Sequence, residues 1–465
     1  MSLSSVAISA SARAGKKSEK DADIIEFVEA SWGLKMTLFP VQRVILKAHY
    51  GLELDDEKTF EISDWTRTKI ETHTEKSYLR KIYEDGRCNI GEVIPGKQRR
   101  EMILSIGRRS GKCVTGETLI PTNKGLVRID SLGDPNGDEV QPLQVNVAQE
   151  CGTNSRSAYF YNGGVKPTKY LETFCGYRIE GTGNHRIKVM TKECRVEWKY
   201  LEEIEVGDMA CINRTSQLWP TEYVDISRYR TDGSQPKYLD EKWGELLGLL
   251  AGDGHWTDTR AVGMTVGEKA FEPYLMTLFR DLFGKVSYHP DKRKVDVGRI
   301  GAYGKDLRKF LDHLGWVVDC TTKTKSVPHT ILKSPMSVVC AFLRGLFETD
   351  GSAYDSAITL SSASYQLAHE VQMLLVNIGI VANLSKSNRE DRTEYRIRLK
   401  GSKSKRLFDQ HIGFISDRKK KCLESVLSKV SYRGGNEGVP HFYGYYQRLK
   451  QFYPNVKCKI DKTTK

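Results

Sequence analysis

The chain lacks any long apolar run. None of its segments approaches the roughly 18 uninterrupted apolar residues of a membrane-spanning helix. Residues 1–23 have small and basic side chains without the apolar centre of a signal peptide. We therefore expect residues 1–23 to be a disordered tail and the protein to work in the cytoplasm without a membrane partner.

Metal-site spacing of cysteine is missing as well. The ten cysteines include no Cys-x-x-Cys pair and no His/Cys ligand spacing, which argues against a zinc site or a disulfide framework and favours a reducing compartment. Positive charge, by contrast, is plentiful, since 72 Lys and Arg against 59 Asp and Glu give a net charge of +13. This excess favours a polyanionic partner, although a merely basic soluble protein remains an alternative. The 465 residues are enough for about three domains.

A phosphate-binding loop ends one residue short of completion at residues 105–112, SIGRRSGK. Its glycines would let backbone N–H groups approach phosphate oxygens, and its lysine would reach the β and γ phosphates. The candidate nucleotide contacts are Gly107, Arg108, Arg109, Gly111 and Lys112. Such a loop needs Ser or Thr after the lysine to hold Mg²⁺, but Cys113 stands there and no helical pattern follows.

The segment before this loop resembles the start of a phage terminase large subunit, the ATP-driven motor that packages DNA. Residues 24–50 carry helix-spaced apolar residues on both sides of a break, and FPVQ at 39–42 matches the aromatic-Pro-x-Gln segment of that family. The resemblance implies that residues 24–112 are a fragment of an α/β ATPase in which Gln42 contacts adenine. Ile106 departs from the small residue usual in the family, and the acidic Mg²⁺-binding strand and the nuclease domain are missing. We therefore expect ATP to bind only to a spliced host protein.

The residues from Cys113 onward resemble an intein, the self-splicing insert of the Hint family. CVTGETLIPTNKG at 113–125 matches the first block of that family, and GTGNH at 181–185 matches the second. Short β-like runs separated by Gly, Asn and Pro predict that residues 113–214 are an all-β domain, the N-terminal part of the splicing domain. A single Ser or Thr after the insert would complete both the splice junction and the phosphate loop of the host.

The resemblance implies roles for three side chains. Cys113 would attack the carbonyl of Lys112 and convert that peptide bond into a thioester. An amide is a poor acyl donor, so its nitrogen needs a proton, which His185 would donate while Thr182 orients the group. Taken singly, each of the three has a duller interpretation, as a small buried Cys, a surface His and a turn Thr.

Residues 243–420, which follow a polar connector at 215–242, contain the same unit twice. LLGLLAGDG at 246–254 and LRGLFETDG at 343–351 are each an apolar helix with small residues on one face, ending in an acid and a glycine. Each is followed by a β-run, a helix ending in glycine, a basic β-run and a further helix. The pattern predicts a duplicated unit of helix, two strands, helix, two strands, helix.

Both motifs resemble the LAGLIDADG motif of homing endonucleases. The resemblance implies a monomeric, pseudo-symmetric saddle that lies in the major groove of double-stranded DNA, with Lys and Arg contacting phosphates; the alternative is a pair of solvated sheet faces. Gly248 and Gly345 would let the two motif helices pack closely. Asp253 and Asp350 would then bind Mg²⁺ together, each serving one DNA strand. The candidate lysines that help to activate water are Lys400 and Lys294.

The closing His-Asn of an intein is missing from the basic, Tyr-rich tail at 421–465. We expect either a truncated chain or a separate polypeptide that completes the intein in trans. The sequence as a whole predicts an α+β multidomain protein: an ATPase fragment, a partial Hint domain and a complete DNA endonuclease within a terminase precursor. Two rival functions remain, a LAGLIDADG module that binds DNA without cleaving it and a DNA-packaging motor that hydrolyses ATP.

Overall fold

The structure, a computed structural model, describes part of the chain in two units. These units are Met1–Ser110 and Gly111–Lys465. The described residues are 23–29, 38–63, 70–84, 92–95, 113–149, 152–214, 216–229, 236–258, 261–291, 296–304, 306–316, 322–389, 392–429, 446 and 450–452. The residues predicted as sites that lie outside these ranges are Gly107, Arg108, Arg109, Gly111, Lys112 and Lys294.

The described residues of the first unit form three helices and a hairpin. Their bounds are α2 (Ile24–Glu29), α3 (Pro40–Tyr50), β1 (Thr59–Ser63), β2 (Ile70–Thr74) and α4 (Glu75–Glu84). Helix α3 begins at Pro40, as the break in the sequence pattern predicts, because proline loses no hydrogen bond in the first turn of a helix. Val44, Leu79 and Ile82 belong to a small core that α3 and α4 share.

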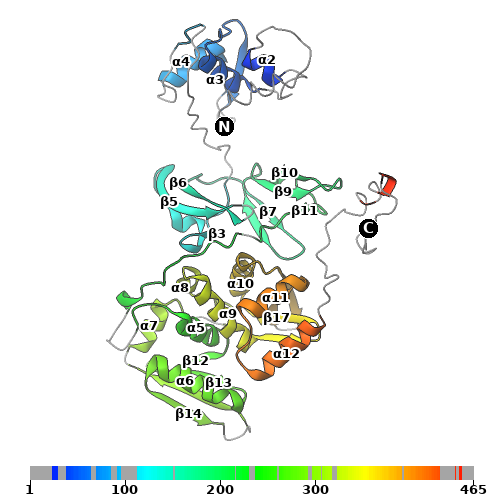
Figure 1. Ribbon diagram of the computed structural model, residues 1–465. Coiled ribbons are helices and arrows are strands. Elements are labelled where there is room, and N and C mark those ends of the chain that lie inside the picture. The colour runs from blue at the N-terminus through cyan, green and yellow to red at the C-terminus, as the bar shows by residue number, and fades with distance from the viewer. Residues whose placement is uncertain are drawn as a thin grey trace. The chain divides into compact units, whose positions relative to one another are not determined.

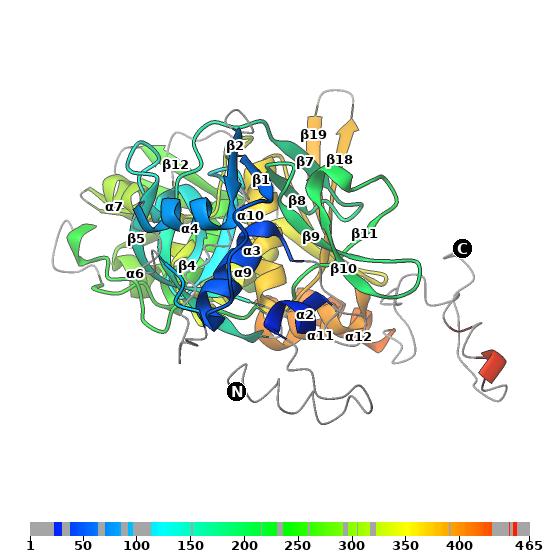
Figure 2. The ribbon, with the colours of Figure 1, turned by 90° about the horizontal axis from the view of Figure 1, so that it is seen from above.

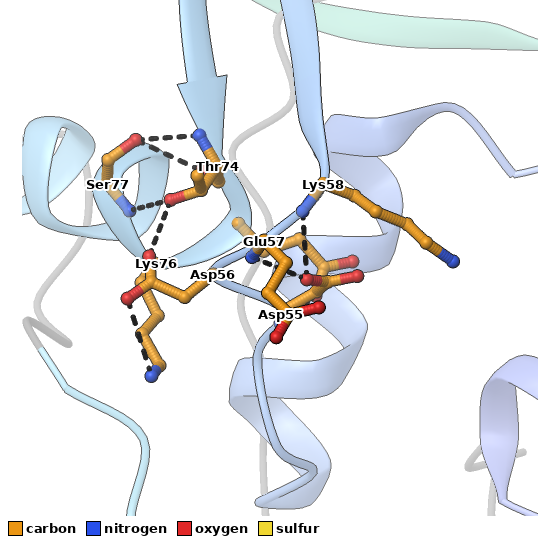
Figure 3. Close-up of polar contacts among 8 residues, drawn as sticks. Asp55, Asp56, Glu57, Lys58, Thr74, Lys76 and Ser77 are labelled. Atoms are coloured by element: carbon orange, nitrogen blue, oxygen red, sulfur yellow. Dashed lines mark hydrogen bonds and ion pairs between the residues drawn. The ribbon is translucent and has the colours of Figure 1, made fainter.

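Side-chain hydrogen bonds fix the turn that leads into β1 (Figure 3). The Asp55 carboxylate accepts the N–H of Glu57 at 2.8 Å and that of Lys58 at 3.1 Å. The N–H of Lys58, together with that of Glu57, lowers the pKa of Asp55. The Thr74 hydroxyl donates to Asp56 at 2.9 Å, so the end of β2 is tied to the same turn.

Residues 113–214 form strands and short 3₁₀ helices, as the turn-rich pattern predicts (Figure 1). The strands are β3 (Leu119–Thr122), β4 (Gly125–Arg128), β5 (Val140–Ala148), β6 (Asn154–Tyr161), β7 (Lys169–Glu172), β8 (Arg178–Gly181), β9 (Arg186–Met190), β10 (Val196–Tyr200) and β11 (Met209–Ala210). They pair in the orders β4-β3-β5-β6, β10-β9-β11 and β7-β8. The pairs between these strands are antiparallel, which suits strands joined by short turns.

The following part of the chain contains two copies of one unit, which confirms the predicted duplication (Figure 1). The first repeat is α5 (Glu241–Asp253), β12 (Gly254–Asp258), β13 (Ala261–Val266), α6 (Glu272–Phe283), β14 (Val286–Pro290), β15 (Gly298–Tyr303) and α7 (Leu307–His313). The second repeat is α9 (Met336–Asp350), β16 (Gly351–Tyr354), β17 (Ala357–Ser362), α10 (Tyr365–Ile378), β18 (Ala382–Arg389), β19 (Arg392–Leu399) and α11 (Gly401–His411). Their sheets have equivalent strand orders, β12-β13-β15-β14 and β16-β17-β19-β18. Figure 2 shows β18 and β19 standing out from the rest of the second repeat.

Helices α5 and α9 pack against each other at two glycines. A Cβ added to Gly248 would lie 2.0 Å from the carbonyl oxygen of Phe342, and one added to Gly345 would lie 2.2 Å from that of Glu245. Any side chain at either position would displace backbone of the partner helix, so the structure confirms the predicted close approach. The two motif helices thereby end at the same place.

Two further helices complete the second unit, α8 (His329–Leu332) and α12 (Asp417–Ser428). Helix α12 runs through the domain boundary predicted after residue 420. Ile226 and Leu239, from the segment predicted to be a polar connector, are fully buried in the core of the two repeats. The connector is therefore part of that core. No helix among the described residues is long and apolar enough to cross a membrane.

Hydrogen bonds join the strand part to the second repeat. The Cys175 carbonyl accepts the N–H of Leu384 at 3.0 Å and the side-chain amide of Gln372 at 2.8 Å. The Tyr177 hydroxyl accepts the N–H of Ala382 at 3.3 Å. These bonds link the segment between β7 and β8 to α10 and to the start of β18, so the two parts pack directly on each other.

Candidate active site at the ends of two helices

Asp253 and Asp350 are the last residues of α5 and α9. The structure brings them together, since Asp350 Oδ1 lies 3.1 Å from the point where a Cβ on Gly252 would stand. Both helices stop in the same way, with an extended glycine, Gly254 or Gly351, whose N–H bonds back to the last turn. The glycines therefore end each helix at its acid and let the chain turn directly into a strand.

Both carboxylates resist ionisation. Burial raises the pKa of Asp350 to about 6, with Lys325 acting against the shift and the neighbouring Asp253 adding to it. Burial also raises the pKa of Asp253, again opposed first by Lys325 and then by Lys419. Loss of water disfavours the charged form of a carboxyl group, and a nearby cation restores it. The pair is thus a place where added positive charge is favourable.

Two lysines lie at the same helix ends. Lys325 Nζ donates to the carbonyl oxygens of Ala251 and Gly252, at 2.7 and 3.0 Å, at the end of α5. Lys419 Nζ, from α12, donates to the carbonyls of Phe347, Glu348 and Gly351 at the end of α9. A cation here complements the negative end of the helix dipole. Each motif helix therefore ends with an acid, and a lysine from another segment of the chain caps its last carbonyls.

The sequence prediction names two other lysines for this site. Lys400 lies at the N-cap of α11, and Lys294 lies outside the described residues. The lysines whose charges act on the two acids are Lys325 and Lys419. Lys325 follows α7 and Lys419 follows α11, the last helices of the two repeats. This equivalent position in both repeats is a signal in the sequence that could have indicated the two lysines. It is weak, because Lys419 stands in a run of basic residues and Lys325 is one of several lysines in a short polar segment.

A cavity of about 710 Å³ opens beside Asp253. Its lining includes Glu348 and Lys419 from the ends of α9 and α12. An ion pair of 2.9 Å between Arg418 and Glu268 crosses from α12 to the first repeat at its wall. The site thus has room for a substrate group next to one acid, lined by charges of both signs.

The donor set suits a hard divalent cation. Carboxylate oxygens are the ligands that Mg²⁺ prefers, and Mg²⁺ is usually held by one or two carboxylates together with water and substrate phosphates. Within the described part of the chain, no group of three or more His, Cys, Asp or Glu side chains could hold a metal ion. A cation held by Asp253 and Asp350 would therefore take its other ligands from water and substrate. The raised pKa values of the two acids fit such a cation, which would favour their ionised forms.

A second cluster surrounds Cys113. The N–H of Cys113 donates to the Thr182 hydroxyl at 3.1 Å, and the N–H of Thr182 donates to the Cys113 carbonyl at 2.9 Å. The Thr182 hydroxyl also donates to Asn184 at 2.8 Å. His185 stands in the same turn, with its N–H bonded to the Thr182 carbonyl at 2.8 Å. The Thr182 hydroxyl therefore contacts the nitrogen of Cys113.

Two residues beside the Cys113 thiol are absent from the sequence prediction. A Cβ added to Gly163 would lie 2.5 Å from Cys113 Sγ and 3.5 Å from Lys166 Nζ. Gly163 therefore leaves the room in which the sulfur lies, with a lysine close by. Neither residue belongs to a recognisable motif, because their proximity to Cys113 arises only when the turn after β6 folds back.

In the first unit, the Gln42 side chain caps the helix to which it belongs, α3. Its side-chain oxygen accepts the N–H of Phe39 at 3.0 Å, which caps the start of α3. The Phe39 ring is 72% exposed. The predicted contact of Gln42 with adenine stays a prediction, since the phosphate loop lies outside the described residues.

Residues 337–413 match the family model described as a LAGLIDADG-like domain. The matched segment runs from the second residue of α9 through α11. The second repeat is therefore similar to a LAGLIDADG-like domain. Its two-fold counterpart, the first repeat, has the same order of helices and strands.

The curated proteins to which this chain is similar are of different kinds. The chain is 28% identical over 354 residues to the replicative DNA helicase DnaB of Rhodothermus marinus, covering 72% of this chain and 35% of the helicase. It is 25% identical over 332 residues to the replication factor C small subunit of Methanocaldococcus jannaschii, covering 68% and 17%. It is 24% identical over 348 residues to a DNA gyrase protein of Mycolicibacterium flavescens, covering 70% and 59%. The chain thus spans less than two thirds of the length of these relatives.

Among solved structures, a mesophilic variant of the homing endonuclease I-DmoI aligns with 40% of this chain and 97% of its own, at a TM-score of 0.30 and 16% identity. I-DmoI in complex with DNA and Mn aligns with 37% and 96%, at a TM-score of 0.29 and 18% identity. Full-length DUF199/WhiA aligns with 46% and 68%, at a TM-score of 0.29 and 18% identity.

Proposed function

We propose that the two repeats form a metal-dependent DNA endonuclease that cuts both strands of a specific double-stranded site. The observation that carries the proposal is the pair Asp253 and Asp350, brought together at the ends of helices packed through glycine, each with a lysine at the same end. Two neighbouring acids whose pKa values are both raised serve no evident structural purpose, because their surroundings disfavour their charge. The LAGLIDADG-like match of the second repeat supports this function.

The chain's own residues would hold and orient the reacting groups. A divalent cation held by Asp253 and Asp350 would supply Lewis-acid chemistry to the phosphodiester. Lys325 and Lys419 would place positive charge where a phosphate gains negative charge as water attacks phosphorus and the P–O bond breaks. The proton lost by water would pass to solvent or to a neighbouring carboxylate.

The DNA-binding surface would be the solvent face of the two sheets. Exposed basic residues on strands of the repeats include Arg299, Lys386, Arg396 and Arg398. Contacts from such side chains to phosphates release counterions, so we expect affinity to fall steeply with salt. Contacts to base edges in the major groove would set the site.

The decisive experiment uses the purified chain, Mg²⁺ and a plasmid library with random inserts, with cut ends captured and sequenced. We expect double-strand breaks at one recurring sequence, lost with EDTA and in the Asp253→Asn and Asp350→Asn variants. Salt-sensitive binding to a recurring site without any breaks would favour the non-cleaving DNA-binding module instead. ATP hydrolysis by the same sample would point to the rival packaging motor.

A second function is favoured by the contacts of Cys113: we infer that residues 113–214 are the N-terminal part of an intein splicing domain. The Thr182 hydroxyl holds the Cys113 nitrogen, the atom that must leave when the thiol attacks the carbonyl of Lys112. In that acyl shift the Cys113 thiol gives up its proton to solvent and forms an S–C bond, the C–N bond breaks, and the nitrogen takes up a proton, for which His185 is the candidate donor.

The comparisons support an insert. A helicase, a replication factor and a gyrase have different names and different activities, yet each aligns with about 70% of this chain at similar alignment lengths. Residues shared by such unrelated proteins are expected of a mobile element rather than of a common catalytic domain. The host would then be the protein to which residues 1–112 belong, and we propose a phage terminase large subunit for it.

Intact mass with and without a small thiol tests the splicing chemistry. We expect dithiothreitol to release residues 1–112 from the wild-type chain and to leave the Cys113→Ala variant whole. A wild-type chain that also stays whole would remove the acyl shift from this protein and leave the endonuclease as its activity.

A further inference from the structure

We propose that three buried residues of the second repeat are positioning residues for the two lysines of the site: Glu370 and Ser364 for Lys325, and Glu348 for Lys419. The inference rests on the proposed endonuclease function. None of these residues touches the reacting groups in the proposed mechanism, and none belongs to the pair of acids.

Lys325 lies in a segment without helix or strand, so its place depends on side-chain contacts. Ser364, which is fully buried, donates its hydroxyl hydrogen to the Lys325 carbonyl at 2.5 Å. Glu370, 5% exposed, accepts the N–H of Val327 at 2.7 Å. The backbone is therefore held at the lysine itself and two residues after it.

These two contacts come from one helix. Ser364 is the N-cap of α10, where its oxygen accepts the N–H of Leu367 at 3.2 Å. Glu370 lies further along α10, and its second oxygen accepts the side-chain amide of Gln366 at 2.7 Å. Both groups are thus held in place by α10 itself. A helix of the second repeat thereby fixes the lysine that caps the motif helix of the first repeat.

Lys419 is fixed differently. Glu348, two residues before Asp350 on α9, accepts the backbone N–H groups of Ile415 at 2.7 Å and Ser416 at 3.2 Å. These N–H groups lie at the start of α12, from which Lys419 reaches back to the carbonyls at the end of α9. The contact is reciprocal: α9 holds the start of α12, and α12 caps the end of α9.

The difference between the two arrangements follows from one motif position. Ala251 occupies in the first motif the place that Glu348 occupies in the second, two residues before the acid. The first motif therefore has no carboxylate of its own for this task, and α10 supplies one from outside. A lysine side chain loses much rotamer entropy when it is held in one geometry, so a fixed backbone makes its placement less costly.

We expect each substitution to slow the cleavage of one DNA strand more than that of the other. Glu370→Ala should release Lys325 and slow cleavage at the α5 end, whereas Glu348→Ala should release Lys419 and slow cleavage at the α9 end. Misplacement of a positioned group by about 1 Å costs up to about 100-fold in rate. We therefore expect each alanine variant to slow one DNA strand by about 10-fold or more relative to the other, with opposite strand preference.

The test is single-turnover cleavage of a duplex that carries the recurring cut site, with the two strands labelled differently. Glu370→Gln and Glu348→Gln keep an oxygen acceptor and should recover most of the rate lost in the alanine variants. Glu424→Ala, at an exposed carboxylate on α12, controls for charge removal. Thermal unfolding and DNA binding without Mg²⁺ are measured for every variant.

Opposite strand preferences with glutamine rescue support the positioning roles. Equal slowing of both strands in step with lost thermal stability overturns them, because that result describes a merely structural role. A wild-type chain that cuts neither strand overturns the endonuclease proposal and this inference together. Wild-type cutting with unchanged alanine variants overturns this inference alone.

Discussion

Burial raises the pKa of Asp350 to about 6 at the end of α9, whereas an unperturbed Asp carboxyl titrates near about 3.9. Between these values the unfolded chain gives up its proton before the folded protein does. Stability therefore falls as pH rises through this window, and the penalty is fully present above it. Charged Asp350 thus destabilises the metal-free protein at neutral pH, the condition under which a cation would bind most strongly.

Asp350→Asn should stabilise the metal-free protein near pH 7.5 by about 1–3 kcal/mol, because one unit of pKa shift corresponds to about 1.36 kcal/mol. Near pH 3.5 the gain should vanish, since both states then hold the proton. Urea unfolding in EDTA at the two pH values measures the difference. Asp409→Asn, at an exposed position of α11, is the control. A loss of stability at neutral pH would contradict the raised pKa.

Gly163→Ala should block the chemistry of Cys113 while leaving the strands folded. The added Cβ would lie 2.5 Å from Cys113 Sγ, closer than any two such atoms approach, so the thiol must move. We expect thiol-induced release of residues 1–112 to slow by about 10-fold or more. Gly164→Asn is the matched control, because its Cβ meets open space and Asn accepts the positive φ of that residue. Equal rates for both variants would show that the sulfur reacts from another place.

At the scale of elements, the crossing of α5 and α9 decides where both acids lie. Gly248→Ala would place a Cβ 2.0 Å from the Phe342 carbonyl, and overpacking of this kind costs about 1–3 kcal/mol or more. We expect unfolding at lower urea concentration and slower cutting of both DNA strands together, since both acids shift. Gly267→Ala, where the new Cβ meets nothing within 4 Å, is the control. A variant that slows one strand only would contradict the shared crossing.

The repeated elements could be predicted because their signals are local. An apolar helix that ends in acid and glycine occurs twice, and the helix ending at Gly379, with its positive φ, follows the second copy as the pattern predicts. Apolar periodicity and glycine positions depend on residues that are close in the sequence. The duplication and the pair Asp253 and Asp350 can therefore be predicted without any tertiary information.

The lysines of the site could not be predicted in this way. Lys325 reaches the end of α5 only because α10, which comes later in the chain, holds its segment through Glu370. Lys400 stands at the end of a basic strand, and the sequence alone gives no reason to prefer Lys325 to it. Which lysine lies at the site depends on contacts between segments that are distant in the sequence. Such contacts cannot be predicted from the spacing of residues along the chain. Gly163 and Lys166 beside Cys113 were missed for this reason too.

On the scale of the whole molecule, the buried residues that the structure describes form two separate cores. Val44, Leu79 and their neighbours form the core of the first unit, and the repeats form that of the second, which also includes Leu119 and Leu126 of the strand part. Residues 113–214 thus share a core with the repeats. We therefore expect two unfolding transitions for the chain, with strands and repeats in the same one.

Differential scanning calorimetry of two variants tests this division. Leu79→Ala, at a side chain 2% exposed, removes about 2–5 kcal/mol from a buried site and should lower only the transition of the first unit. Gly176→Ala should lower only the other, because its positive φ disfavours a side chain and its Cβ would lie 2.5 Å from the Leu384 carbonyl. If Gly176→Ala splits that transition in two, the strand part folds without the repeats. A single shifted transition means that the contact between Cys175 and β18 couples them, so a change made for splicing also alters the endonuclease.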